Sequence, residues 1–164
     1  MPLAADPWLV SHPPSRTARL LLSLPLLLYR CRLGWVLGHR FLVICHRGRV
    51  SGQLHRTVVE VLRYDPLTQE AFVITPWPTT ANWYRNLVAS PAVELWIGRA
   101  RYQPQQRFLD PDEVESTLDA YAQKGRGEAL GLRRLMGWSQ DLPRERREEI
   151  ASRLGALAFR PPPC

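Results

Sequence analysis

The sequence has very little lysine, and its first third has almost no acid. Lys124 is the only lysine among 164 residues, and no Asp or Glu occurs between Asp6 and Glu60. The three cysteines are odd in number and form no C-x-x-C pair, and the four histidines lack a metal-ligand spacing. These absences argue against a disulfide framework and a zinc site. We therefore expect no metal and a reducing, cytoplasmic compartment.

The sequence also lacks an apolar run long enough to span a membrane. The longest one covers residues 20–29 and is flanked by Arg19, Arg30 and Arg32, whereas a spanning helix needs about 20 residues. No small-residue cleavage site follows it, which argues against a signal peptide. Two interpretations stay open for residues 20–32: a helix that covers the core, or peripheral contact with the cytoplasmic face of a membrane.

Positive charge is concentrated where acid is missing. The chain carries a formal charge of +7, and eight arginines lie between residues 16 and 56. Arginine holds phosphates and carboxylates through two parallel hydrogen bonds, which favours an anionic partner: a phosphorylated cofactor, a nucleic acid or an anionic membrane. The aromatic residues are not interleaved with these arginines as a base-stacking surface requires, so nucleic acid is not predicted.

The hydrophobic pattern predicts an α+β fold, mainly β, built as a small antiparallel barrel with flanking helices. Short strands are expected at residues 41–45, 57–64, 71–75, 93–97, 100–103 and 156–159, with a tight turn at Gly98-Arg99. Helices are expected at residues 79–91, capped by threonines, at 110–123, and around 128–136 and 143–154. Asp110, Pro111 and Glu113 form a capping-box signature for the second of these helices.

The segment with the clearest chemical signal connects the first two predicted strands. Residues 46–57 read H-R-G-R-V-S-G-Q-L-H-R-T. Glycines let backbone N–H groups approach a ligand, Ser51 and Thr57 add hydroxyl groups, and the arginines add charge. This combination is typical of a phosphate-binding loop, although basic glycine-containing turns also occur without a ligand.

Two motifs in this region resemble the deazaflavin-dependent nitroreductase family. Residues 48–56 are similar to that family's G-R-x-[ST]-G-x-x-R segment, and residues 82–91, N-W-Y-R-N-L-V-A-S-P, are similar to its W-Y-x-N-L-x-x-x-P helix. The order and the approximate spacing also agree, over roughly residues 28–123. The resemblance implies a split β-barrel of the FMN-binding type over residues 33–160, preceded by a tail and helical segment at residues 1–32.

The resemblance also implies a cofactor, coenzyme F-420, with FMN as the alternative. It assigns the binding of this cofactor to residues of the loop, of the end of the third strand and of the following helix: Arg47, Arg49, Val50, Ser51, Gly52, Gln53, His55, Arg56, Thr75, Pro76 and Trp83. Many members of the family have lysine at the position of Val50 and arginine at that of His55. Tyr84 and Tyr121 are the candidate proton donors, and packing alone also explains both.

These features together predict an oxidoreductase. A reduced deazaflavin would transfer a hydride to an electron-poor small molecule, such as an enone, a quinone or an unsaturated acyl chain, which explains why the chain has no catalytic triad or carboxylate pair. Two alternatives remain: an FMN-binding split-barrel reductase, and a non-catalytic basic protein that binds a cofactor or a membrane. A homodimer is compatible with the fold.

Overall fold

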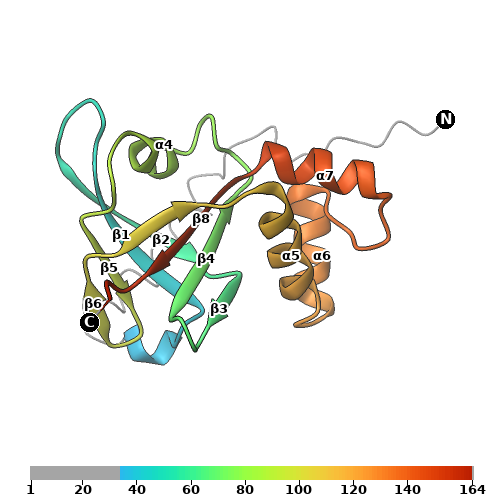
Figure 1. The fold of residues 1–164 in the computed structure, drawn as a ribbon, viewed down its shortest axis with the longest axis horizontal. Coiled ribbons are helices and arrows are strands. Elements are labelled where there is room, and N and C mark those ends of the chain that lie inside the picture. Colours follow the sequence, from blue (N-terminus) through green and yellow to red (C-terminus); the bar gives the residue numbers. More distant parts are fainter. Residues whose placement is uncertain (1–33, 164) are drawn as a thin grey trace.

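The protein has two antiparallel four-stranded sheets that form a split barrel, and a group of helices at one side (Figure 1). The structure, a computed structural model, describes residues 34–163. One sheet has the spatial order β2 (Leu54–Glu60), β1 (Phe41–Arg47), β5 (Glu94–Ile97) and β6 (Ala100–Tyr102). The other has the order β3 (Arg63–Asp65), β4 (Glu70–Thr75), β8 (Gly155–Arg160) and β7 (Gln105–Phe108). The predicted fold class is confirmed.

Two helices lie next to barrel strands in the sequence, and three others form a separate group. A short 3-10 helix, η1 (Gly34–Leu37), precedes β1, and α4 (Asn82–Ala89) lies between β4 and β5. The remaining helices, α5 (Pro111–Ala122), α6 (Arg126–Met136) and α7 (Arg144–Arg153), lie together beside the barrel, where we call them the helical lobe (Figure 1). The predicted segment at residues 20–32 lies outside the described residues.

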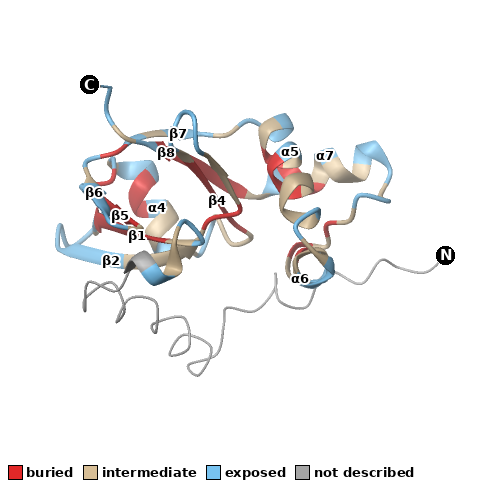
Figure 2. Cartoon of the chain, turned by 90° about the horizontal axis from the view of Figure 1, so that it is seen from below, coloured by how far each residue is buried: buried red, intermediate tan, exposed pale blue. Residues whose placement is uncertain are grey.

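The barrel core follows from the alternation of side chains along its strands. Leu42 and Ile44 of β1 point to the interior, where they join Val73 of β4 and Leu157 of β8 in one fully buried cluster. Successive strand residues face opposite sides of a sheet, so His46 lies on this same inner face. Figure 2 shows buried residues along the strands β1, β4 and β5 and also on helices α4 and α5.

The helical lobe is inserted between two strands that pair with each other. β7 and β8 are antiparallel neighbours with Phe108 opposite Leu157, although α5, α6 and α7 separate them in the sequence. Directly beyond this pair, the Leu109 N–H donates to the Ala156 carbonyl at 3.2 Å. The lobe shares its apolar core with the barrel, because Leu62 and Ile74 pack with the lobe residues in one cluster.

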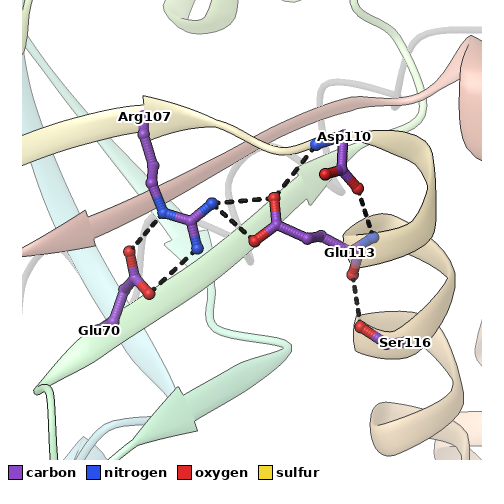
Figure 3. A network of polar contacts seen from close by, with 5 residues as sticks. All are labelled: Glu70, Arg107, Asp110, Glu113 and Ser116. Carbon is purple, nitrogen blue, oxygen red and sulfur yellow. Dashed lines mark hydrogen bonds and ion pairs between the residues drawn. The ribbon is translucent and has the colours of Figure 1, made fainter.

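Polar contacts fasten α5 to the barrel (Figure 3). Asp110 accepts from the Glu113 N–H at 2.8 Å, and the Glu113 carboxylate accepts from the Asp110 N–H at 3.2 Å, so the predicted capping box is confirmed. Arg107 of β7 donates to Glu70 of β4 at 2.8 Å and to Glu113 at 2.7 Å. One guanidinium therefore bridges the second sheet and the first turn of the helix.

One predicted strand was wrong, because residues 57–64 do not form a single strand. They divide between β2 in the first sheet and β3 in the second. Between them, Val61 packs into the barrel core and donates its N–H to the Arg40 carbonyl, while Leu62 joins the lobe's cluster and donates to the Phe72 carbonyl. The sequence stays rich in β-branched residues through this crossover, so composition hides the change of sheet.

The predicted threonine cap was also wrong, and one strand was missed. α4 begins at Asn82 with Ala81 as its N-cap and no side-chain cap, because a turn in which Ala81 donates to the Trp77 carbonyl occupies the preceding residues. The missed strand, β7, has a polar sequence. Its Gln106 is half-buried and bonds Ala92 N–H and Leu87 carbonyl, which explains an inward-facing amide there.

The other predicted elements are confirmed with small shifts at their ends. The last strand and the three lobe helices lie where the pattern indicates. Gly98 has a φ of 55°, the left-handed conformation that its tight turn with Arg99 requires, and it connects Ile97 with its partner Ala100.

Candidate functional site

The loop between β1 and β2 is closed by its own backbone. The Gly48 N–H donates to the Gln53 carbonyl and the Gly52 N–H donates to the Gly48 carbonyl, both at 2.8 Å. Gly52 has a φ of 67°, which suits glycine. A Cβ on Gly48 would stand 2.6 Å from Ser51 Oγ and 3.0 Å from His55 Nε2. A side chain at this position would therefore require Ser51 or His55 to move.

Helix α4 lies beside this loop and contacts it through Arg49 (Figure 1). The Arg49 N–H donates to Asn86 Oδ1 at 3.1 Å, and its guanidinium Nη1 donates to Asn86 Oδ1 at 3.0 Å and to Asn82 Oδ1 at 3.2 Å. Asn82 and Asn86 are four residues apart, so both lie on one face of the helix. Neutral amides thus position the guanidinium without neutralising its charge.

A buried histidine continues this network into the barrel. His46 is 2% exposed, its Nδ1 lies 3.1 Å from Asn86 Nδ2, and its Nε2 lies 3.0 Å from Thr57 Oγ1. Burial, with a smaller contribution from the charge of His55, lowers the pKa of His46 to about 4. The His55 ring stacks beside it with centroids 5.8 Å apart. His46 is therefore neutral at pH 7.

The loop, the adjoining ends of β1 and β2, and α4 line an open cavity of about 380 Å³. Its lining combines backbone, hydroxyl, amide, imidazole and guanidinium groups with one indole: His46, Gly48, Arg49, Val50, Ser51, His55, Arg56, Thr57, Asn82, Trp83 and Asn86. None of these lining residues is acidic. The cavity is suited to an oxyanion, with Trp83 as an apolar wall, and we call it the loop cavity.

The structure brings together about half of the predicted cofactor-binding residues. Those that line the loop cavity are Arg49, Val50, Ser51, His55, Arg56 and Trp83, whereas Arg47, Gly52 and Gln53 belong to the same loop but not to the lining. Arg47 instead donates to the Gly52 carbonyl at 3.3 Å, and the Gln53 N–H donates to Ser51 Oγ at 3.3 Å. These contacts shape the loop.

Strand alternation separates His55 from Arg56. His55 pairs across the ladder with His46, and Arg56 pairs with Cys45. Neighbouring residues of a strand face opposite sides. Arg56 borders the loop cavity, but its guanidinium lies over the Trp96 ring, 5.3 Å from the ring centroid, on the outer face of the sheet. His55 is thus the better placed of the two residues to complete the site.

Thr75 and Pro76 are not part of the loop cavity. Thr75 is 3% exposed, and its Oγ1 accepts from the Trp77 N–H at 3.2 Å. A Cβ on the paired residue Gly155 would stand 2.9 Å from Thr75 Cγ2 and 2.8 Å from the Tyr84 ring. The hydroxyl of Thr75 therefore shapes the turn after β4, in a tightly packed part of the barrel.

The two candidate proton donors lie in different parts of the molecule. Tyr84 on α4 packs edge-on against Trp83 and Phe108, and burial raises its pKa. Tyr121 on α5 donates to Glu60 Oε1 at 2.9 Å. It lines another cavity, of about 270 Å³, between the barrel and α6. Burial, and then the bond to Glu60, raise the pKa of Tyr121. Only Tyr84 adjoins the wall of the loop cavity.

Sequence reasoning did not assign a role to His46 or Asn82, and it noted Thr57 only as a hydroxyl. A signal existed for His46 and for Asn82. His46 continues the inward-facing series of Leu42 and Ile44 along β1, which makes a polar side chain there unusual. Asn82 stands one helical turn before Asn86, so the two amides share a face.

Comparison with known proteins finds a similar fold at low sequence identity. No protein-family model matches the chain, and no curated protein matches it significantly. A structure described as a domain-swapped dimer superposes with a TM-score of 0.50 at 15% identity, over 76% of this chain and 82% of that one. At this identity the similarity is one of fold.

Two further structures give lower scores. An F-420-H2-dependent reductase has a TM-score of 0.49 at 12% identity, over 74% of this chain and 95% of that one. A pyridoxamine 5'-phosphate oxidase-related, FMN-binding protein from Nostoc punctiforme has 0.44 at 18% identity, over 93% and 82% of the two chains.

Two classes of feature are missing from the described part of the chain. Within residues 34–163, no helix is long and apolar enough to cross a membrane. In the same range, no three His, Cys, Asp or Glu side chains are grouped so that they could hold a metal ion.

Proposed function

We propose that the protein is an oxidoreductase that holds the phosphate of coenzyme F-420 in the loop cavity. The observation that carries the proposal is the composition of this cavity, which joins the Arg49 guanidinium, two hydroxyl groups and a glycine loop with no acidic residue in its lining. The family resemblance of the loop and of α4 favours a deazaflavin over FMN, the alternative cofactor. Residues 33–160 then form the cofactor-binding domain.

Three observations support the fit of the residues present to a cofactor that has an anionic group and a planar ring. Arg49 is positioned by neutral amides, so its charge is available to a ligand. Ser51 Oγ lies close to the backbone of Gly48, where an added Cβ would stand 2.6 Å from it. Trp83 adds an apolar surface beside these groups, as a cofactor with a planar ring requires.

When bound, the reduced deazaflavin supplies the hydride, and the substrate we propose is an electron-poor double bond such as that of an enone, a quinone or an unsaturated acyl chain. The chain's own contribution is to bind and orient. Arg49, Ser51 and Thr57 would hold the anionic end of the cofactor, and Trp83 would shield one side of it from water. Tyr84 adjoins Trp83, where its hydroxyl is the candidate group for returning a proton; burial raises its pKa above the ordinary value.

The experiment that tests the proposal is titration of the purified protein with F-420 and with FMN, followed by mass spectrometry of the bound species. We expect F-420 to bind, and its reduced form to be oxidised when an enone or quinone is added. Binding of FMN alone would identify the alternative reductase. Binding of neither cofactor would overturn the proposal and leave a non-catalytic basic protein.

Three further parts of the hypothesis concern location and assembly. We propose that the protein acts in the cytoplasm and that residues 1–32 are an appendage, with peripheral membrane contact through residues 20–32. We also propose a homodimer, an assembly compatible with a fold shared with a protein described as a domain-swapped dimer. Cell fractionation tests the location, and protein extracted only by detergent would contradict peripheral attachment. Light scattering tests the homodimer.

A further inference from the structure

The orientation of the Asn86 amide is fixed by its neighbours. Two groups of Arg49, the backbone N–H and the guanidinium Nη1, both donate to Asn86 Oδ1, at 3.1 and 3.0 Å. Donors require an acceptor, so the oxygen faces Arg49 and the amide nitrogen faces the other way. Asn86 Nδ2, a donor, lies 3.1 Å from His46 Nδ1. His46 Nδ1 must therefore accept.

The same argument places the proton of His46. A neutral imidazole with an accepting Nδ1 carries its hydrogen on Nε2. His46 Nε2 lies 3.0 Å from Thr57 Oγ1, so the ring donates and the hydroxyl oxygen accepts. The Thr57 hydroxyl hydrogen remains free for another acceptor. Thr57 lines the loop cavity, and a ligand in this cavity can provide that acceptor.

We propose that His46 is a positioning residue whose neutral ring, protonated on Nε2, makes Thr57 a hydrogen-bond donor to the loop cavity and thereby selects an oxyanion. The proposal rests on the proposed function for the identity of the oxyanion, a phosphate group. It extends that function, because a buried side chain that does not need to touch the ligand determines that Thr57 donates a hydrogen bond into the cavity.

Packing alone does not explain this histidine. Its neighbours on the inner face of β1, Leu42 and Ile44, are aliphatic, and a phenylalanine would fill a similar volume. It would, however, leave Asn86 Nδ2 without an acceptor and would release the Thr57 hydroxyl to rotate. Protonation would also break the network, because an imidazolium has two donors and Asn86 Nδ2 is itself a donor.

Several charged or titratable groups face this network. His55 stacks on His46 from β2, and the Arg49 guanidinium reaches Asn86 from the loop. Burial of the ring is the largest cause that disfavours a positive charge on His46, and the charge of His55 adds to it, whereas a backbone hydrogen bond with Arg47 acts in the opposite direction. The pKa of His46 is lowered to about 4.

The test uses the full chain, four variants and inorganic phosphate as the probe. His46→Phe removes both ring contacts, whereas His46→Gln keeps an acceptor and a donor side by side. Thr57→Val removes the hydroxyl, and Thr57→Ser keeps it. We expect His46→Phe and Thr57→Val each to weaken phosphate binding by about 10- to 100-fold, the effect of losing a hydrogen bond to a charged group. His46→Gln and Thr57→Ser should retain most of the affinity.

Nitrogen-15 NMR of the imidazole rings provides a readout that is independent of binding. We expect the wild-type His46 ring to show the Nε2-protonated neutral form at pH 7 and to keep it down to about pH 5. A ring protonated on Nδ1, or already charged at pH 6, would overturn the proposal. Thermal unfolding controls for folding, and if His46→Phe does not fold, the Thr57 pair and the NMR spectrum still decide.

The outcomes separate this inference from the proposed function. Equal phosphate affinity in wild type, His46→Phe and Thr57→Val would refute the role of His46, whether or not a deazaflavin binds. Absence of phosphate binding in the wild type would refute it as well. Failure of F-420 and FMN to bind, together with the expected pattern for phosphate, would refute the cofactor assignment and leave the oxyanion site.

Discussion

The two ends of the β1–β2 hairpin differ in whether an arginine lies beside an acidic side chain. At the loop end, Arg49 is held by asparagine amides, and no acidic residue lines the cavity. At the other end, where Phe41 pairs with Glu60, the carboxylate of Glu60 accepts from Tyr121 and faces Arg40 at 3.5 Å. Six residue steps, about 20 Å, separate these ends.

The comparison favours the loop cavity, over the cavity lined by Glu60 and Tyr121, as the binding site for an anion. The pairs at the Glu60 end are complete within the chain, so their main effect is to join β2 to α5. The positive charge at the loop end lacks a counter-charge among the lining residues, and an external anion would supply it. We therefore expect variants of the loop end to change binding and variants of the Glu60 end to change stability.

The largest expected effect is that of Arg49→Ala on anion binding. Loss of its guanidinium should weaken binding of F-420, or of inorganic phosphate as a probe, by about 1–3 kcal/mol, or 5- to 150-fold. Arg40→Ala is the matched control, because it removes an arginine from the other end of the same hairpin. Isothermal titration at two salt concentrations measures both, and added salt should narrow the difference.

An equal loss of affinity in Arg40→Ala and Arg49→Ala would contradict the comparison, because general electrostatic attraction would then suffice. Arg56→Ala should fall between the two variants, since its guanidinium lies over Trp96 on the outer face of the sheet.

The second prediction concerns pH. The pKa of His46 is about 4 in the folded protein, below the ordinary value of 6.5. The unfolded chain therefore binds a proton between these values that the folded protein does not, and the free energy of unfolding should fall as the pH drops from about 6.5 to 4. Urea unfolding across this range measures it. His46→Gln should lose this component of the slope.

A smaller effect is expected at the Glu60 end. Tyr121→Phe removes the hydrogen bond to Glu60 and should lower the free energy of unfolding by about 1 kcal/mol. Phosphate binding should stay unchanged. Stopped-flow oxidation of the reduced cofactor gives the decisive comparison: a fall of 100-fold or more in Tyr121→Phe, with Tyr84→Phe unaffected, would make Tyr121 the proton donor.

The smallest expected effect is a gain in stability. A Cβ on Gly131 of α6 would meet no atom within 4 Å, and alanine favours the interior of a helix. Gly131→Ala should therefore raise the free energy of unfolding by about 0.4–1 kcal/mol. Gly48→Ala is the contrasting variant, because its Cβ would crowd Ser51 and His55 in the loop. It should weaken phosphate binding, and a stabilised Gly48→Ala with normal binding would contradict the loop geometry.

The sequence predicts the fold better than the site. Hydrophobic alternation indicates the inner strands, and Asp110 with Glu113 indicates the start of α5, because these signals are local. The change of sheet at Val61 and Leu62 depends on contacts with Arg40 and Phe72, distant residues that local composition does not encode. β7 was missed because its inward residue is a glutamine that bonds α4.

For the site, the loop and Trp83 were predicted from their motifs. His46 was not, because its role depends on Asn86 and Thr57, which different elements bring to it. Thr75 was assigned to the cofactor by resemblance alone, and in the structure its hydroxyl bonds the turn after β4. Whether these residues bind a cofactor stays a prediction.

Because of where the helical lobe is inserted, its length should have little effect on the stability of the barrel. Residues 109 and 156 are hydrogen-bonded neighbours, so the chain leaves and re-enters the second sheet at one place. The entropy of closing a loop grows only with the logarithm of its length, and doubling it costs about 0.6 kcal/mol. The barrel could therefore tolerate a longer or shorter insertion at this point, with the pairing of Phe108 and Leu157 preserved.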